Sequence, residues 1–281
     1  MSEVVQMQIE DGVALLTLNR PERLNAWTQE MEHAYFGLLA GCAEDERVRA
    51  IVVTGAGRGF CAGADMQQLQ ALGDAAQPAD AQPPDAHAAA PGNGAAPAQT
   101  RERLPQSFPL TIPKPIVAAI NGACAGIGLV QALMCDLRFA ARGAKLTTAF
   151  ARRGLVAEHG IAWMLPRLVG PARALDLLLS GRVVLAEEAH ELGLVNRVAS
   201  PEALLEETLA YARDMAVNCS PASMATMKSQ VYADLARPLP DALAAADELM
   251  LASFAKPDFV EGVASFVERR EPRFAAYHPA H

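Results

Sequence analysis

Residues 112–141, IPKPIVAAINGACAGIGLVQALMCDLRFAA, decide the fold. They run from an apolar segment suited to a buried strand, through a glycine-rich turn, into a segment with helical periodicity. Residues 50–72, AIVVTGAGRGFCAGADMQQLQAL, repeat the same order. A strand, a glycine turn and a helix that occur twice are typical of an α/β core. We therefore predict the α/β class.

The N-terminal segment predicts a β-hairpin followed by an amphipathic helix. VVQMQIE and VALLTLN alternate apolar and polar residues on either side of Asp11-Gly12, a dipeptide that favours tight turns. After NRPERLNAW, Thr28 is of the residue type that caps helix N-termini. Apolar residues then recur at helical spacing: Met31, Ala34, Tyr35, Leu38, Leu39 and Cys42. We expect that face to pack on the core.

From Trp163 onward the sequence predicts successive helices. The last of them has an apolar face suited to packing on a neighbouring subunit. That face consists of Phe259, Val260, Val263, Phe266 and Val267. We divide the chain into a core, residues 1–200, and a C-terminal helical region, residues 201–281.

Residues 73–100 form an Ala/Pro-rich insertion between the two strand–turn–helix units. They contain no Val, Ile, Leu, Met, Phe, Tyr or Trp, so they cannot bury enough apolar area to offset the entropy lost on ordering. We expect a flexible surface insertion without catalytic residues. Two roles remain open for it, an inert spacer and a lid over a nearby site.

Composition excludes several classes of function. The 281 residues carry a formal net charge of −8, which disfavours nucleic acid as a partner. The five cysteines are scattered, without a CxxC pair or a His cluster at metal-ligand spacing, which indicates reduced thiols in a cytoplasmic protein and no metal site. The acidic N-terminus does not resemble a signal peptide, and no apolar run is long enough to span a membrane.

The glycine turns also raise a dinucleotide-binding interpretation. GACAGIG has the glycine spacing of short-chain dehydrogenases. It does not lie in an N-terminal βαβ unit, however, and no tyrosine is followed four residues later by lysine. The sequence also lacks a G-x-S-x-G elbow, a P-loop and an H-E-x-x-H motif. We therefore disfavour an oxidoreductase.

A glycine turn at a helix N-terminus offers free backbone N–H groups, and two such turns can stabilise a developing oxyanion of the kind formed from thioesters. Two of four further motifs contain these turns: the four are NRPERLNA (19–26), GRGFCAGADM (57–66), KPIVAAINGACAGIGL (114–129) and LVNRV (194–198). In this order they resemble the enoyl-CoA hydratase/isomerase, or crotonase, superfamily. The resemblance covers the chain apart from the insertion.

The resemblance implies a crotonase-like ββα spiral core with a C-terminal helical trimerisation region, assembled as a homotrimer or hexamer. It also implies an acyl-CoA substrate and no permanently bound cofactor, since coenzyme A arrives as part of the thioester. By position, the amides of Ala64 and Ile127 would hold the thioester oxygen while an enolate forms. Many relatives have glycine where Ile127 stands, but a backbone N–H does not depend on the side chain.

The resemblance places the acid/base chemistry on one carboxylate. Val130 and Phe150 stand where hydratases of the family have two glutamates, and neither can move a proton. Glu158 stands where several isomerases of the family have a carboxylate. We expect Glu158 to shuttle a proton in a dry pocket lined by Phe150, Trp163 and Val130. The alternative is an exposed glutamate at a helix start, and we interpret His159 as a solvated or capping residue.

The resemblance also implies the residues that contact coenzyme A, including some on the last helix of a neighbouring subunit. The matching positions are Arg23, Leu24, Ala26, Ala62, Asp65, Met66, Phe266 and Arg269. The family often has lysine where Glu22 stands, so the phosphate contact would pass to Arg23. The alternative is that Arg23 and Arg269 are plain surface charges.

Three functions compete with an enoyl-CoA isomerase. The first is a hydratase in which Glu158 positions water for addition to a 2-enoyl-CoA. The second is a relative that binds acyl-CoA without turnover, because both usual glutamates are missing. The third is an RNA-binding relative on the same fold, which the acidic composition disfavours.

Overall fold

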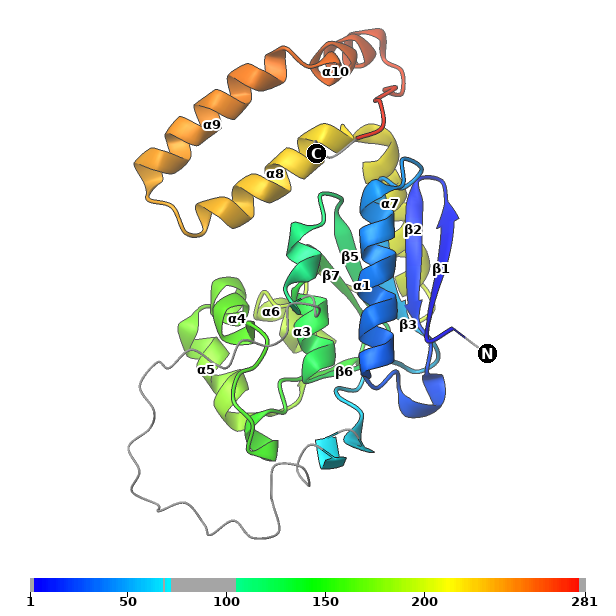
Figure 1. Ribbon diagram of the computed structural model, residues 1–281, viewed down its shortest axis with the longest axis vertical. Coiled ribbons are helices and arrows are strands. Elements are labelled where there is room, and N and C mark those ends of the chain that lie inside the picture. The colour runs from blue at the N-terminus through cyan, green and yellow to red at the C-terminus, as the bar shows by residue number, and fades with distance from the viewer. Residues whose placement is uncertain (1–2, 68, 72–104, 278–281) are drawn as a thin grey trace.

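The computed structural model describes residues 3–67, 69–71 and 105–277. Its larger sheet has six strands in the order β1-β2-β3-β5-β7-β10, and its smaller sheet has four in the order β4-β6-β8-β9. Figure 1 shows α1 (Gln29–Glu44) in front of the larger sheet and α7 (Leu204–Asn218) behind it. The central strands β3 and β5 are accordingly buried along their whole length.

Three consecutive strand pairs build the core. The pairs are β3 (Ala50–Gly55) with β4 (Gly59–Cys61), β5 (Ile116–Ile120) with β6 (Ala123–Ala125), and β7 (Leu137–Ala141) with β8 (Lys145–Thr147). The first strand of each pair joins the larger sheet and the second joins the smaller one, in both cases in parallel. Helical residues follow the first two pairs, at 66–67 and 69–71 and as α3 (Ile127–Leu133). The predicted α/β class and its repeated unit are confirmed.

The two N-terminal predictions are confirmed as well. β1 (Val5–Glu10) and β2 (Val13–Leu18) form an antiparallel hairpin. Asp11 and Gly12 both have positive φ, 49° and 78°, as the turn requires. Thr28 caps α1 by accepting a hydrogen bond from the Met31 amide at 3.1 Å.

The C-terminal half contains two strands that the sequence analysis did not predict. Its helices are α4 (Ile161–Val169), α5 (Pro171–Ser180), α6 (Ala186–Glu191), α7, α8 (Pro221–Asp234), α9 (Leu239–Phe254) and α10 (Pro257–Glu268). Between them lie β9 (Val184–Leu185) and β10 (Arg197–Ala199), which close the edges of the two sheets. Strands of two and three residues are too short to leave a periodic pattern, so the expectation of helices alone was wrong here.

The structure places α7 with the core, although the boundary drawn at residue 200 assigns it to the C-terminal region. Its buried residues Leu204, Thr208 and Ala212 face the larger sheet, and α7 contacts β2, β3, β5 and β7. The helices that stand away from the sheets therefore begin with α8 (Figure 1). The insertion predicted at residues 73–100 lies outside the described residues.

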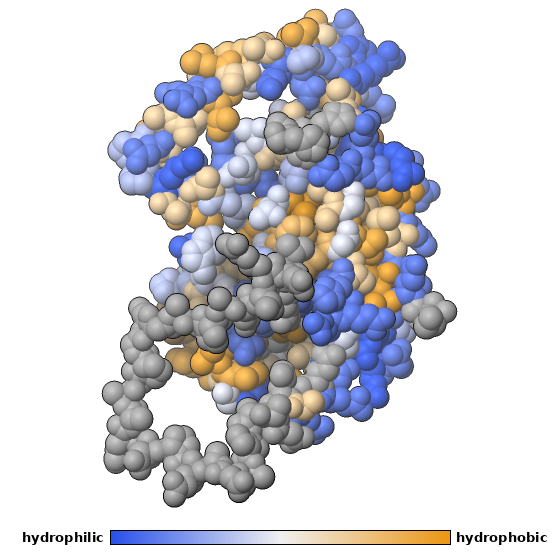
Figure 2. All heavy atoms as spheres, viewed as in Figure 1, coloured by the Kyte–Doolittle hydropathy of each residue, from blue (hydrophilic) through white to orange (hydrophobic). Residues whose placement is uncertain are grey.

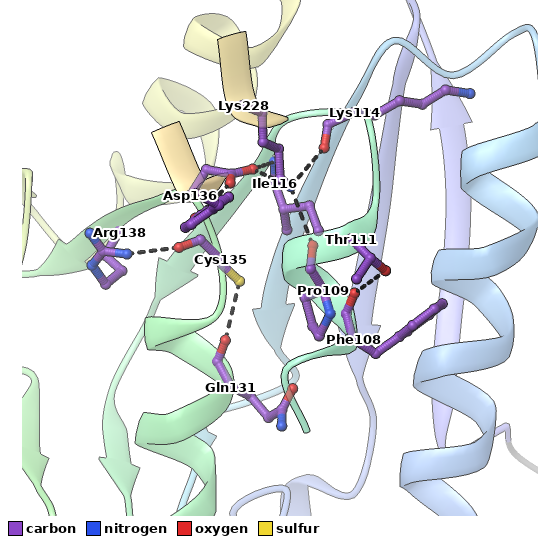
Figure 3. A network of polar contacts seen from close by, with 11 residues as sticks. Phe108, Pro109, Thr111, Lys114, Ile116, Gln131, Cys135, Asp136, Arg138 and Lys228 are labelled. Carbon is purple, nitrogen blue, oxygen red and sulfur yellow. Dashed lines mark hydrogen bonds and ion pairs between the residues drawn. The ribbon is translucent and has the colours of Figure 1, made fainter. Parts of the chain in front are cut away.

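One polar network attaches α8 to the core (Figure 3). Lys228 of α8 forms a 2.8 Å ion pair with Asp136, whose carboxylate also accepts hydrogen bonds from the Ile116 amide and the Tyr232 hydroxyl. The side chains of Lys228 and Asp136 are only 8% and 18% exposed. Asp136 thus has a structural role.

Replacing Lys228 by methionine should destabilise the protein by about 2–4 kcal/mol, because it leaves a largely buried carboxylate without its cation. The measurement is the urea midpoint of unfolding. Arg237→Met is the matched control, since it removes an exposed ion pair with Asp234 just beyond α8 and should cost less than about 0.5 kcal/mol. Equal effects of the two variants would contradict a special role for the Lys228 pair.

Helices α9 and α10 have apolar side chains that are exposed to solvent. Figure 2 shows hydrophobic residues interspersed with hydrophilic ones on the surface of this end of the molecule. Phe266, Val267 and Leu239 are 85%, 73% and 71% exposed, and α9 buries no residue at all. None of the helices that the structure describes is long and apolar enough to cross a membrane.

Candidate active site

A cavity of about 1100 Å³ opens between the segment around η1 (Pro21–Arg23), the start of α1, the segment after β4, the start of α3 and the loop before α4. Most of the residues that the sequence analysis singled out line it. These are Arg23, Ala26, Ala62, Ala64, Asp65, Met66, Ile127, Phe150 and Glu158. The strand–turn–helix units therefore bring residues from distant parts of the chain to one site.

The amides of Ala64 and Ile127 both stand at turns on the cavity wall. Trp27 pairs with the residues on either side of Ala64: its amide donates to the Gly63 carbonyl and its carbonyl accepts from the Asp65 amide, at 2.8 and 3.0 Å. Ile127 is the first residue of α3, where N–H groups have no partner within the helix. Within the described part of the chain, neither amide donates a hydrogen bond. Two donors therefore remain available at this wall.

Glycine allows these two turns to approach each other. A Cβ atom at Gly128 would lie 2.3 Å from the Cys61 carbonyl oxygen, so only glycine lets α3 pack this closely on β4. Gly126, at φ 51°, turns the chain into α3 and donates to the Thr147 carbonyl at 3.1 Å. The glycines of GACAGIG thus serve the packing of the two turns.

Glu158 lies on the cavity wall in the loop between η3 (Ala151–Arg153) and α4. Its side chain is about one-third exposed, and Oε2 lies 3.6 Å from His159 Nε2. His159 and Gly160 both have positive φ, 57° and 82°, and the backbone there turns before α4 begins. No side chain makes a capping hydrogen bond to α4, and the first turn of α4 contains no acidic residue.

Asp65 is held by its own structural contacts. Arg20 Nη2 and the Gln67 amide each donate to its carboxylate at 3.0 Å. Burial raises the pKa of the Asp65 carboxyl, but the hydrogen bonds from Arg20 and Gln67 outweigh this effect and the pKa is lowered. Asp65 is therefore an ionised residue that fixes the turn carrying Ala64.

Cys61 lies directly behind the same turn, fully buried. Burial raises the pKa of its thiol to about 12. A pKa of 12 leaves about one thiolate in ten thousand at pH 8, and the thiolate is the reactive form. The structure gives Cys61 the environment of a packing residue.

The native protein should expose only Cys219 to a thiol reagent at pH 8, because the other four cysteines are buried. Burial raises the pKa values of the Cys42 and Cys135 thiols to about 11 and about 12, so these thiols also stay protonated. Counting thiols with a chromogenic disulfide before and after denaturation should give about one and then five per chain. Rapid labelling of Cys61 in the folded protein would contradict this assignment.

Sequence reasoning missed Glu32, a carboxylate that is 1% exposed and lines the cavity from α1. Its Oε2 accepts hydrogen bonds from Trp27 Nε1 at 3.3 Å and from Gln106 Nε2. Gln131 in turn donates to Gln106 Oε1 at 2.6 Å. The sequence feature that could have indicated this site is an acidic residue, Glu32, among the apolar residues that recur at helical spacing from Met31 to Cys42.

Five predicted site residues lie outside the cavity of their own chain. Val130 is fully buried in the core. Trp163 lies on α4, 39% exposed, with the Arg167 guanidinium over its ring. The expectation that these two residues line the pocket was therefore wrong. Ile161, Met164 and Leu165 form the buried face of α4, which directs Trp163 outward. Leu24 ends η1 in a left-handed conformation. Phe266 and Arg269 lie at the end of α10.

No group of three or more His, Cys, Asp or Glu side chains within the described ranges could hold a metal ion. The two free amides and the Glu158 carboxylate line the same cavity, an arrangement that suits the stabilisation of an oxyanion and the movement of a proton.

Comparison with known proteins agrees with the fold. The profile of the enoyl-CoA hydratase/isomerase family matches residues 8–90 and 94–277. The 1,2-epoxyphenylacetyl-CoA isomerase of Escherichia coli is 34% identical over 98% of this chain and 99% of its own length. The "Probable enoyl-CoA hydratase" of Rhodobacter capsulatus is 35% identical over 96% of this chain and 97% of its own.

A solved structure shows the same architecture. The crystal structure of a "probable enoyl-CoA hydratase/isomerase" from Mycobacterium abscessus superposes with a TM-score of 0.82 at 30% identity and covers 97% of this chain and 99% of its own. Fold, motifs and near full-length similarity therefore agree: the chain belongs to the enoyl-CoA hydratase/isomerase, or crotonase, family of enzymes that act on acyl-CoA thioesters.

Proposed function

We propose that this enzyme moves a carbon–carbon double bond in an enoyl-CoA. Glu158 removes a proton from the α-carbon of a 3-enoyl-CoA, and the electrons pass through the C3–C4 double bond and the thioester carbonyl as a dienolate. The amides of Ala64 and Ile127 hold the negative oxygen. Glu158 then returns the proton to the γ-carbon, which yields the 2-enoyl-CoA with no net gain or loss of atoms.

The observation that carries this proposal is the single uncommitted carboxylate on the cavity wall. Of the three acids that line the cavity, Asp65 is bound to Arg20 and Glu32 accepts from Trp27 and Gln106. Only Glu158 has no hydrogen bond or ion pair among the described residues other than the 3.6 Å contact with His159. One carboxylate suffices for a proton transfer between two carbons, whereas the family's usual hydration uses two.

The coenzyme A moiety binds along the wall formed by Arg23, Ala26, Ala62, Asp65 and Met66. Arg23 supports this placement because, within the described ranges, its guanidinium has no carboxylate within 4 Å and lies beside the cavity. Leu24 shapes the turn that carries Arg23. Phe266 and Arg269 reach the ligand from the last helix of a neighbouring subunit.

Self-association as a homotrimer or hexamer accompanies this arrangement. The exposed apolar face of α9 and α10 supports it, since exposed apolar patches of this kind usually mark interfaces. Light scattering of the purified protein should give three or six times the chain mass. A monomer would contradict both the assembly and the placement of Phe266 and Arg269.

Enoyl-CoA hydration is the second candidate function. The similarity to proteins named as hydratases favours it, and the one-third exposure of Glu158 would admit water. Incubation with a 3-enoyl-CoA and, separately, with a 2-enoyl-CoA distinguishes the two reactions. The proposal expects rapid double-bond migration in the first and little 3-hydroxyacyl-CoA in the second. Hydration without migration would favour the hydratase, and tight binding without turnover would leave an acyl-CoA-binding protein.

A further inference from the structure

Arg153 is a cation on the cavity wall that the reaction described above does not use. It ends η3, three residues after Phe150 and five before Glu158, and all three residues line the cavity. Its Nη1 donates to the Ala149 carbonyl at 3.2 Å. Within the described residues, no carboxylate lies within 4 Å of its guanidinium. Most of its five N–H donors are therefore available to a ligand.

Neighbouring arginines are committed elsewhere. Arg152, the preceding residue, donates from Nε to the Ser180 carbonyl and packs against Gly181. Arg167 donates to the Trp163 carbonyl and stacks on its ring, and Arg182 pairs with Asp176 and Glu188. Arg153 differs from these arginines in both features, because it lines the cavity and lacks a carboxylate or aromatic partner among the described residues.

The position of Arg153 indicates that its side chain faces the acyl group of the substrate. Given the proposed function, Glu158 must lie over the α- and γ-carbons of the substrate, so the wall that carries Glu158 faces the acyl chain. Arg153 belongs to that wall, together with Phe150 and Leu155. Arg23 instead lies near Asp65, where its charge helps to lower the pKa of that carboxyl, on the wall proposed for coenzyme A.

We infer that Arg153 selects acyl-CoA substrates whose acyl group carries a carboxylate at its far end. The inference rests on the proposed function. A guanidinium pairs with a carboxylate through two parallel hydrogen bonds, which gives both attraction and orientation. Phe150 and Leu155 supply apolar contact for the methylene groups between the reacting carbons and that carboxylate.

Electrostatics of the wall favour this assignment. Glu158 and Glu32 both line the cavity, so an anionic acyl group would meet two carboxylates unless a cation compensates them. Arg153 is exposed to solvent beside the cavity, so an acyl group ending in a methyl group would gain nothing from it. An acyl group ending in a carboxylate would gain a charge-assisted contact.

The test uses two 3-enoyl-CoA substrates with six acyl carbons, one ending in methyl and one in carboxylate. We expect wild-type kcat/KM to favour the carboxylate substrate at least about tenfold, mainly through KM. Arg153→Leu should reduce that preference by about 10- to 100-fold, the usual worth of a charge-assisted hydrogen bond. Arg153→Lys should restore part of it. Arg152→Leu, a change of the same kind one residue away from the cavity wall, should leave the preference as in the wild type.

Two results would overturn the inference. One is a wild type that does not prefer the carboxylate substrate. The other is a loss in Arg153→Leu that is equal for both substrates, which would place Arg153 on the coenzyme A part. If neither substrate is isomerised, the proposed function fails by itself. Calorimetric binding of the two matching saturated CoA thioesters to wild type and Arg153→Leu then still decides the role of Arg153.

Discussion

A Glu158→Gln variant should lose double-bond migration by about 10²- to 10⁴-fold in kcat, the contribution typical of a positioned general base. Glutamine has nearly the same shape as glutamate, so the cavity keeps its form. The amide can neither accept the α-proton nor deliver one to the γ-carbon. The thioester still binds to the same wall, so the affinity for a saturated acyl-CoA should change much less than kcat. Absorbance of the conjugated product and calorimetric binding measure the two effects separately.

Glu188→Gln is the matched control for this experiment. Glu188 pairs with Arg182 on the surface and does not line the cavity, so its conversion to glutamine makes the same chemical change outside the site. Its activity should equal that of the wild type. Migration that persists in Glu158→Gln within a fewfold of wild type would show that another group moves the proton. Glu32 would then be the first candidate, since it is a further cavity carboxylate.

Local sequence patterns were sufficient for the parts of the fold that local interactions determine. The hairpin turn at Asp11-Gly12, the Thr28 cap and the glycine turns are each specified by neighbouring residues. The strand β10 is different, because it is held by its parallel pairing with β7, about 60 residues earlier. No short-range periodicity contains that information.

The site residues divide in the same way into those that nearby sequence motifs predict and those that only contacts distant in the sequence place. Ala64, Ile127 and Glu158 were predicted from the family resemblance of the motifs around them, and the fold brings all three to one cavity. Glu32 could not be placed, because its burial depends on Gln106, which is 74 residues away and donates to its carboxylate. Arg153 gave no signal either, since only the fold shows that it lines the cavity while Arg152 does not.

The second large effect is expected when the Ile127 amide is removed by Ile127→Pro. Ile127 is the first residue of α3, a position where proline is well tolerated because the N–H has no partner within the helix. Gly126 precedes it at φ 51° and ψ −123°, the mirror image of the polyproline conformation, and because glycine has no Cβ this conformation avoids the clash that proline imposes on the residue before it. The substitution therefore removes one oxyanion donor with little strain. We expect kcat to fall by about 10²- to 10³-fold, as when one such donor is lost elsewhere.

Ile127→Ala separates the amide from the side chain, because alanine removes more apolar bulk than proline does but keeps the N–H. Its kcat should stay within about tenfold of wild type, while thermal unfolding should show that both variants are folded. An Ile127→Pro enzyme that is folded and as active as Ile127→Ala would mean that the thioester oxygen is not held at this turn. The proton transfer by Glu158 would then need another source of stabilisation for its dienolate, since a carboxylate is too weak a base to form an enolate whose charge is left unpaired.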